Sequence, residues 1–339
     1  MKDTIVGLDL AKNVFHLATI NQVGKLIKRK KLKRSQVHEY FIQLEPCKVA
    51  MEACASAHYW AREVNAMGHE VELLPPQHVK AYLRGQKNDY NDALAIAESA
   101  LHGTIRPVAI KCVEQQDDQA FHRIRRQLVG DKTRLINQVR GLLAEYGIVL
   151  PQSEAAFRRE IPAILGDAEN GLTVQFRQLL DRQHQRFLSL AEEIAWYRDQ
   201  LNIQAKTDEV CCRLTGIPGF GPVVSSAVKS WMGDGRQFNK GRDASAALGV
   251  VPRQHSTGGK ERLSGITKRG DTYVRTLVIH GARAVVMRAK SKTDPLSLWI
   301  NRLVATRGFN KAVVALANKL VRIAWVIIAR NETYKPGII

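Results

Sequence analysis

Four carboxylates occupy positions from which they could share a metal ion. Asp9 lies near the end of a predicted strand, and Glu52 ends another. Asp89 and Asp92 are three residues apart at the entrance of a predicted helix, a spacing that puts both side chains on one helix face. Hard oxygen ligands of this kind select Mg²⁺ or Mn²⁺. Two such ions, roughly 3.5–4 Å apart, clamp the attacking and leaving oxygens of a phosphodiester. Brought together, these carboxylates predict phosphoryl transfer on nucleic acid.

Each carboxylate also has an ordinary structural explanation. An aspartate in a strand, such as Asp9, is usually a turn or edge residue. Asp89 could be the N-cap of the helix that follows it. The metal-site hypothesis therefore depends on a fold that gathers residues from distant parts of the chain.

A Gly-rich segment displays two hydroxyl groups among basic side chains. Ser256 and Thr257 are flanked by four basic residues, Arg253, His255, Lys260 and Arg262. One interpretation is a basic loop that binds phosphate and uses the hydroxyls as hydrogen-bond partners, and the residues by themselves favour it. The other is a nucleophilic hydroxyl that attacks a DNA phosphate and leaves a phosphoserine link, while nearby cations stabilise the developing charge. Spacing does not decide between the two.

Two further features of this region are typical of DNA-binding proteins. Residues 214–228, which contain Gly219 and Gly221, resemble a helix-hairpin-helix. Its glycines let the backbone approach phosphates, and the N-terminus of the second helix offers free N–H groups. A helix-to-helix turn without a ligand is the alternative. Further along, the basic residues expected to contact nucleic acid are Lys268, Arg269 and Arg275.

The first 105 residues must supply the frame that positions the carboxylates. Their patterns predict strands over 4–10, 15–20, 25–32, 48–52 and 70–74, and helices over 35–44, 58–67 and 93–101. Three strands, helix, strand, helix, strand, helix is the element order of an RNase H-like α/β domain. In that topology the ends of the first and fourth strands are neighbours, and the last helix packs beside them. We therefore assign residues 1–110 to a catalytic domain in which the four carboxylates meet.

The rest of the chain predicts two helical regions. Residues 111–205 contain two long amphipathic helices, over 121–146 and 174–201, joined by an irregular stretch around Pro151 and Pro162. They form either an antiparallel hairpin within their own domain or a coiled coil that dimerises the protein, and imperfect heptads leave both open. From 206 the composition shifts towards Gly, Arg and Lys, which predicts a basic, mainly helical domain over 206–339.

Charge indicates the class of partner and excludes others. The 339 residues include 51 Lys and Arg against 32 Asp and Glu, a formal net charge of +19, so a polyanion is the expected partner. Residues 206–339 hold 23 of the basic and 8 of the acidic residues. The longest apolar run, 323–329, is far shorter than the roughly 18 residues of a membrane span. Charges near the N-terminus argue against a signal peptide. Five cysteines without metal spacing are typical of a reduced, cytoplasmic protein.

Six motifs in order resemble one family along essentially the whole chain. They are Gly7-Leu-Asp-Leu-Ala-Lys12, Met51-Glu-Ala53, Lys87-Asn-Asp-Tyr-Asn-Asp-Ala93, Gly216-Ile-Pro-Gly-Phe-Gly221, Pro252-Arg-Gln-His-Ser-Thr-Gly258 and Ile266-Thr-Lys-Arg-Gly270. Together they resemble the DEDD transposases of the insertion-sequence 110 family, most closely its 1111 subgroup.

The resemblance implies a fold, a site and partners. It implies a RuvC-like N-terminal domain whose carboxylates Asp9, Glu52, Asp89 and Asp92 bind Mg²⁺, then a coiled-coil region and a transposase domain with a serine nucleophile. It also implies a composite site between subunits of a tetramer, and a structured bridge RNA that pairs with DNA. Some members have the serine directly before the glycine, where this chain has Thr257. Ser256, a less hindered primary alcohol, is our choice, and Thr257 stays possible.

The sequence hypothesis is thus an Mg²⁺-dependent DNA transposase that forms a phosphoserine intermediate, guided by a non-coding RNA and acting as a dimer or tetramer. One alternative is a RuvC-like junction nuclease that uses water as the nucleophile. The other is a non-catalytic DNA-binding protein whose carboxylates are structural.

Overall fold

A computed structural model describes residues 4–84, 88–101, 103 and 105–336. Contacts divide the chain into two compact units, Met1–Val113 and Glu114–Ile339. Each unit is described by itself below. The two regions predicted over 111–205 and 206–339 both fall in the second unit, and their division into separate domains stays a prediction.

The first unit contains a five-stranded mixed sheet in the order β3-β2-β1-β4-β5. Strands β1 and β2 are antiparallel, as are β2 and β3, whereas β4 is parallel to β1 and β5 to β4. The element order predicted for the RNase H-like domain is therefore confirmed. The strands are β1 (Thr4–Asp9), β2 (Val14–Asn21), β3 (Leu26–Lys33), β4 (Lys48–Glu52) and β5 (Glu70–Leu74).

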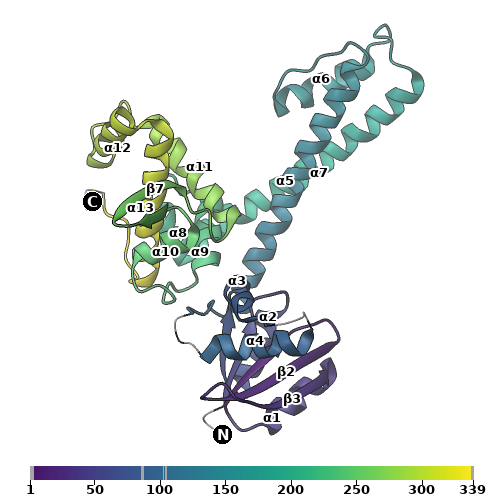
Figure 1. The fold of residues 1–339 in the computed structure, drawn as a ribbon. Coiled ribbons are helices and arrows are strands. Elements are labelled where there is room, and N and C mark those ends of the chain that lie inside the picture. Colours follow the sequence, from purple (N-terminus) through teal and green to yellow (C-terminus); the bar gives the residue numbers. More distant parts are fainter. Residues whose placement is uncertain (1–3, 85–87, 102, 104, 337–339) are drawn as a thin grey trace. The chain divides into compact units, whose positions relative to one another are not determined.

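Helices cover both faces of this sheet (Figure 1). Side chains alternate along a strand, so that Val6 and Leu8 pack with α1 and α2 on one face while Ile5 packs with α4 on the other. Short helical turns precede α1 and α4. The helical elements are η1 (Arg34–Gln36), α1 (Val37–Gln43), α2 (Ala57–Ala66), α3 (Pro76–Val79), η2 (Lys80–Tyr82) and α4 (Asp89–Leu101).

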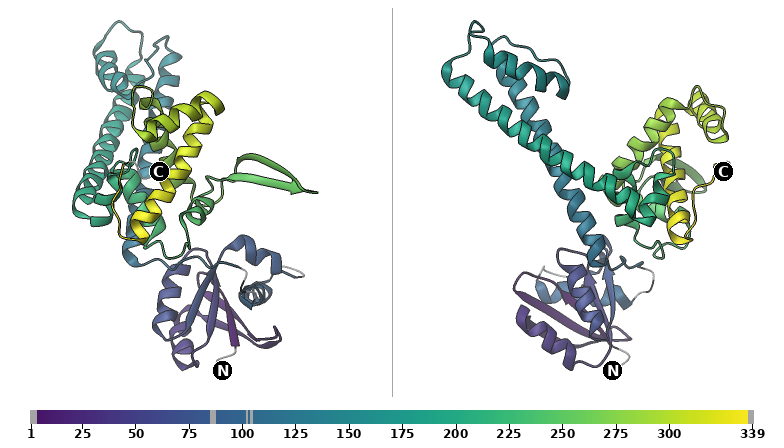
Figure 2. Two further views of the ribbon diagram at one scale, coloured as in Figure 1. Left: turned by 90° about the vertical axis from the view of Figure 1, so that its left-hand side faces the viewer. Right: turned by 180° about the vertical axis from the view of Figure 1, so that it is seen from behind.

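Two long helices begin the second unit, α5 (Val113–Ala144) and α7 (Val174–Thr207). The start of α5 contacts the end of α7, where the rings of Phe121 and Tyr197 are 4.6 Å apart, and the buried Leu143 and Leu180 share a core at the other end. The helices are therefore antiparallel within one chain (Figure 2). The dimerising coiled coil stays untested.

The connection between these helices was expected to be irregular, and this was wrong. It contains the helix α6 (Glu154–Gly166), with Pro162 inside it. Ser153 caps its N-terminus by accepting a hydrogen bond from the amide of Ala156 (2.9 Å). Phe157 and Ile161 are fully buried one turn apart. Burial of these two side chains offsets the hydrogen bond that a proline removes from a helix.

The remaining helices pack around one apolar core. They are α8 (Glu209–Thr215), α9 (Pro222–Met232), α10 (Gly241–Leu248), α11 (Thr272–Arg288), α12 (Pro295–Arg307) and α13 (Phe309–Ala329). Helix α13 is the one described helix long and apolar enough to cross a membrane by length and composition, a feature that the sequence analysis overlooked. Half of its apolar window is buried inside this unit, as in the core helix of a globular protein.

A β-hairpin interrupts the helices, although this region was expected to be helical with a flexible Gly-rich segment. Strands β6 (Pro252–Thr257) and β7 (Lys260–Ile266) are antiparallel, and they extend away from the helices of their unit (Figure 2). Gly258 and Gly259 form the two-residue turn, with φ of +57° and +74°. A turn with positive φ at both positions matches the twist of a hairpin, so the adjacent glycines are its sequence signal.

Candidate active site

Gly7 determines how closely α4 approaches the sheet. A β carbon at this position would lie 2.1 Å from the carbonyl oxygen of Ala93 and 2.6 Å from the amide nitrogen of Ala97, so only glycine fits. Helix α4 therefore packs directly on the backbone of β1. This contact brings the first turn of α4, with Asp89 and Asp92, to the end of β1, where Asp9 lies.

Strand alternation aims three side chains at the same face. Asp9 has the same parity as Ile5 and Gly7, which face α4. His16 lies opposite Asp9 in the antiparallel pair of β1 and β2, and directly opposed side chains share a face. Glu52 follows Met51, the residue that pairs with Leu8 in the parallel pair of β1 and β4, so it lies beside Asp9 at the carboxyl end of the sheet.

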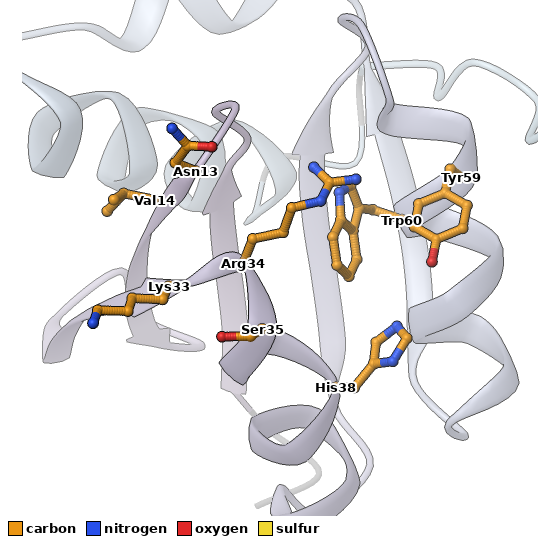
Figure 3. A pocket seen from close by; sticks show the side chains of 8 residues that line it. All are labelled: Asn13, Val14, Lys33, Arg34, Ser35, His38, Tyr59 and Trp60. Atoms are coloured by element: carbon orange, nitrogen blue, oxygen red, sulfur yellow. The ribbon is translucent and has the colours of Figure 1, made fainter.

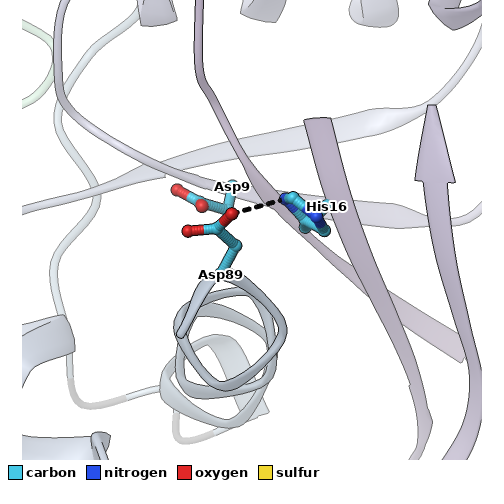
Figure 4. Close-up of side chains that lie close together, drawn as sticks. All are labelled: Asp9, His16 and Asp89. Carbon is cyan, nitrogen blue, oxygen red and sulfur yellow. Dashed lines mark ion pairs between the residues drawn. The ribbon is translucent and has the colours of Figure 1, made fainter. Parts of the chain in front are cut away.

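Asp9, His16 and Asp89 form a group that could hold a metal ion (Figure 4). One ligand atom from each lies within 4.8 Å of the other two. His16 Nδ1 is 3.3 Å from Asp89 Oδ2, and this buried nitrogen makes no hydrogen bond among the described residues. Two carboxylates and a buried imidazole nitrogen without a hydrogen-bond partner fit a divalent cation.

The structure brings together part of the predicted quartet. Asp9 and Asp89 meet, whereas Glu52 and Asp92 lie outside the group of three. Partial burial and then the negative charges of Glu52 and Asp9 raise the pKa of the Cys54 thiol, so both carboxylates act on one small region. Asp92 is half-buried one turn along α4 from Asp89.

His16 is the functional candidate that the sequence analysis missed. Its signal was weak: it is a single polar residue within the apolar strand β2. Only the register between β1 and β2 shows that it faces Asp9. The ring of His16 also packs edge-on against Tyr90, with the centroids 4.8 Å apart, which holds the imidazole against the start of α4.

The N-cap hypothesis for Asp89 was wrong. Asn88 occupies that position, because its Oδ1 accepts a hydrogen bond from the amide of Asn91 (2.9 Å) and its carbonyl accepts from the amide of Asp92 (3.0 Å). Asparagine is among the best N-cap residues. The Asp89 carboxylate is therefore available to Asp9 and His16. Lys87, the first residue of the same motif, lies outside the described residues.

Ser256 and Thr257 lie on opposite faces of the β6–β7 hairpin. Ser256 pairs with Glu261, whereas Thr257 pairs with Lys260 and His255 with Arg262. Gln254 Nε2 donates a hydrogen bond to Ser256 Oγ (2.9 Å). Both hydroxyl residues are exposed. The face that carries Thr257 also carries three basic residues, namely His255, Lys260 and Arg262.

Two residues expected to contact nucleic acid have structural roles in this unit, and their contact with nucleic acid stays a prediction. Arg275 is buried, and its guanidinium donates to the carbonyls of Leu248 (3.2 Å) and Arg269 (2.6 Å), which ties α11 to the preceding loop. At Gly219 a β carbon would lie 2.6 Å from the carbonyl oxygen of Gly281 on α11, so this glycine serves helix packing.

The other positions expected to contact nucleic acid are accessible. At Gly221 a β carbon would meet nothing within 4 Å, so the space in front of α9 is open. The basic side chains that are exposed to solvent are Arg253, Lys260, Arg262, Lys268 and Arg269.

Known proteins are similar to this chain over almost its full length. Residues 6–148 match the DEDD transposase family of IS110, and residues 211–296 match the family described as "Transposase IS116/IS110/IS902 family". A probable family 20 transposase from Pseudomonas aeruginosa is 45% identical over 98% of each chain. The transposase for insertion sequence element IS1111A from Coxiella burnetii is 45% identical over 99% of this chain and 93% of its own.

Among solved structures, RuvC from T. thermophilus in complex with a Holliday junction substrate matches 31% of this chain and 99% of its own. Sequence identity is 17% and the TM-score is 0.25, values that carry no argument about this protein. The family matches and the two transposases provide the assignment: the chain belongs to the IS116/IS110/IS902 family of transposases.

Proposed function

We propose that this transposase cuts and rejoins DNA at a divalent metal site built on Asp9 and Asp89, with Glu52 and Asp92 completing the set. The observation that carries the proposal is the convergence of Asp9, Asp89 and His16 at the carboxyl end of the sheet. Asp9 comes from a strand and Asp89 from a helix 80 residues later, so the fold gathers these carboxylates at a cost in charge repulsion. A bound Mg²⁺ or Mn²⁺ would offset that repulsion and stabilise charge on a phosphate.

The nucleophile that we propose is the Ser256 hydroxyl. Its Oγ forms a bond to the DNA phosphorus, and the bond from phosphorus to the 3′ oxygen breaks. The serine proton passes to that oxygen, which leaves a free 3′-hydroxyl and a serine linked to a 5′ phosphate. The 3′-hydroxyl of another strand reverses the step and joins the new ends. The exposure of Ser256 on a projecting hairpin supports access to DNA.

Two partners complete the proposal. Ser256 and the carboxylates belong to different units of the chain, and we propose that subunits of a homo-oligomer combine them into composite sites. We also propose that a non-coding RNA from the element selects the DNA by base pairing. The exposed basic residues of the second unit would hold phosphate backbones of either nucleic acid, because Lys and Arg contacts to phosphate are independent of sequence.

The test is a search for a covalent protein–DNA adduct. Purified protein, guide RNA, Mg²⁺ and labelled DNA spanning the element's junction are incubated, denatured and separated by size. We expect an adduct that is absent from Ser256→Ala. Cleavage without an adduct would instead favour the water-using nuclease. Metal-independent binding without cleavage would favour the non-catalytic DNA-binding protein.

A further inference from the structure

A cavity of about 670 Å³ lies in the first unit, apart from the carboxylates (Figure 3). Four short segments supply its lining: the start of β2, the end of β3 with η1, the start of α1 and the first turn of α2. The polar and aromatic side chains of the lining include Asn13, Lys33, Arg34 and Trp60.

Strand register places this cavity at the same end of the sheet as Asp9, where β1 finishes and β2 starts. His16 is opposite Asp9, and Val14, which lines the cavity, precedes His16 by two residues at the start of β2. Two strand residues span roughly 7 Å. Val14 in turn pairs with Lys33 on β3. The carboxylates lie on the α4 face and Trp60 on the face of α1 and α2. A DNA strand that passes the end of the sheet could therefore reach both faces.

Two hydrogen-bond donors converge in the cavity. The guanidinium carbon of Arg34 is 5.0 Å from the centre of the Trp60 ring. Trp60 is 3% exposed, and its Nε1–H has no hydrogen-bond partner among the described residues. Figure 3 shows the indole nitrogen at the end of the ring next to the guanidinium. A buried donor without a partner is uncommon, and two adjacent donors call for an acceptor.

The charge of the lining identifies that acceptor. Lys33 and Arg34 are cationic, and none of the described residues that line the cavity is Asp or Glu. One carboxylate, that of Glu63, contacts the lining at 3.2 Å from His38. Arg34 is exposed on a short η1 turn, so its side chain can turn to meet a ligand. A phosphate oxygen carries the negative charge and the lone pairs that these donors need.

We infer that this cavity binds a backbone phosphate of the DNA strand whose neighbouring phosphate lies at Asp9 and Asp89. Arg34 supplies charge, Trp60 Nε1–H supplies a directional hydrogen bond, and Lys33 and Asn13 flank them. This inference rests on the proposed function, since it assigns a second contact to the same DNA strand. It makes Arg34 and Trp60 substrate-positioning residues.

The first test compares variants by fluorescence anisotropy with labelled single-stranded DNA across a salt series. Arg34→Gln should weaken binding and lower the slope of log K against log salt by about 0.7, the value for one lost phosphate contact on a single strand. Trp60→Phe keeps a ring in the core and should weaken binding severalfold at unchanged slope. Lys28→Gln is the matched control. It removes the same single positive charge, from an exposed residue of β3 that does not line the cavity.

Equal slopes for Arg34→Gln and Lys28→Gln would overturn the inference even if Trp60→Phe failed to fold. Unchanged binding by folded Trp60→Phe would remove the indole from the site. RNA of the same sequence forms a second arm. A greater loss of affinity on RNA than on DNA in Arg34→Gln would overturn the assignment to the DNA strand.

The second test measures coupling to one phosphate during cleavage. A neutral methylphosphonate is placed next to the cleaved phosphate. It should slow cleavage by wild type and have no further effect in Arg34→Gln, because the two changes remove one contact. Additive effects would overturn the inference. If Arg34→Gln lowers the salt slope of binding by about 0.7 but wild type cleaves no DNA, the proposed function is refuted and the phosphate site is retained.

Discussion

The backbone of Gly7 in β1 lies so close to that of Ala93 in α4 that a β carbon at position 7 would be 2.1 Å from the Ala93 carbonyl oxygen. That close approach determines the position of the Asp89 carboxylate relative to β1. The glycine in the Gly7-Leu-Asp9 motif therefore serves the site two residues later, since the distance from Asp9 to Asp89 depends on how deeply α4 sits on the sheet.

Gly7→Ala should displace α4 and separate the carboxylates. Overpacking of this kind typically costs about 1–3 kcal/mol, so we expect a lower Tm and weaker Mn²⁺ binding by calorimetry. Gly141→Ala is the control, because a β carbon there meets nothing within 4 Å and the residue lies inside α5. Alanine in a helix interior should leave Tm unchanged or raise it. Normal Mn²⁺ affinity in Gly7→Ala would separate the glycine from the site.

Asp9→Asn should abolish DNA cleavage while the protein stays folded. The substitution removes a ligand and also a negative charge that repels Asp89, so Tm should be unchanged or higher. The expected loss exceeds the roughly 10–100-fold typical of residues that only support a metal ligand. Cleavage assays with Mg²⁺ and thermal melts on one preparation test both parts. If Asp9→Asn instead lowers Tm so far that the protein is unfolded at the assay temperature, unfolding explains the lost activity and Asp9 is a structural residue.

His16→Ala should change the choice of metal. Imidazole nitrogen suits transition metals, whereas carboxylates alone suit Mg²⁺. If His16 Nδ1 is a ligand, its removal lowers affinity for Mn²⁺ more than affinity for Mg²⁺. Titration of both metals into wild type and variant gives the two ratios. Equal losses would show that His16 only orients Asp89, from which its Nδ1 is 3.3 Å.

Ser256→Ala and Thr257→Ala together identify the nucleophile. Only the variant that lacks the attacking hydroxyl should lose the covalent adduct, and both should still bind DNA. Thr257 shares its hairpin face with the basic residues, whereas Ser256 shares its face with Glu261. If Thr257→Ala instead abolishes the adduct, the cations beside it outweigh the accessibility of a primary alcohol. A covalent adduct in both variants would show that neither hydroxyl of this hairpin is the required nucleophile.

Acid should destabilise the second unit through His122. Burial lowers the pKa of this imidazole to about 4, with Arg125 adding to the effect. Its Nε2 contacts Ser226 Oγ at 3.0 Å and its Nδ1 contacts the Tyr273 hydroxyl at 3.2 Å. Between pH 6.5 and 4 the unfolded chain binds a proton that the folded protein does not. The free energy of unfolding therefore decreases as the pH is lowered through this window, by up to about 3 kcal/mol.

The measurement is Tm against pH for wild type and His122→Gln, which keeps an amide for hydrogen bonding. The variant should melt lower at pH 7.5 but lose less stability than wild type between pH 6.5 and 4. Parallel curves would show that another group governs the acid response.

The order of elements in the first unit was predictable because its signals are local. Runs of β-branched and apolar residues bounded by turns predicted the strands, and Asp9 and Glu52 were placed at strand ends from the same patterns. The hairpin β6–β7 was missed because its strands are polar and exposed on both faces, so they lack the apolar alternation that marks a half-buried strand. Helix α6 was missed because Pro162 suggested a break.

The sequence by itself determined the family, through motifs in a fixed order, and the presence of carboxylates near the ends of elements. Only the tertiary structure showed that His16 joins Asp9 and Asp89 and that Arg275 is buried. These facts depend on strand register and on the depth at which a helix packs. Both are contacts between residues far apart in the chain, and no local pattern encodes them.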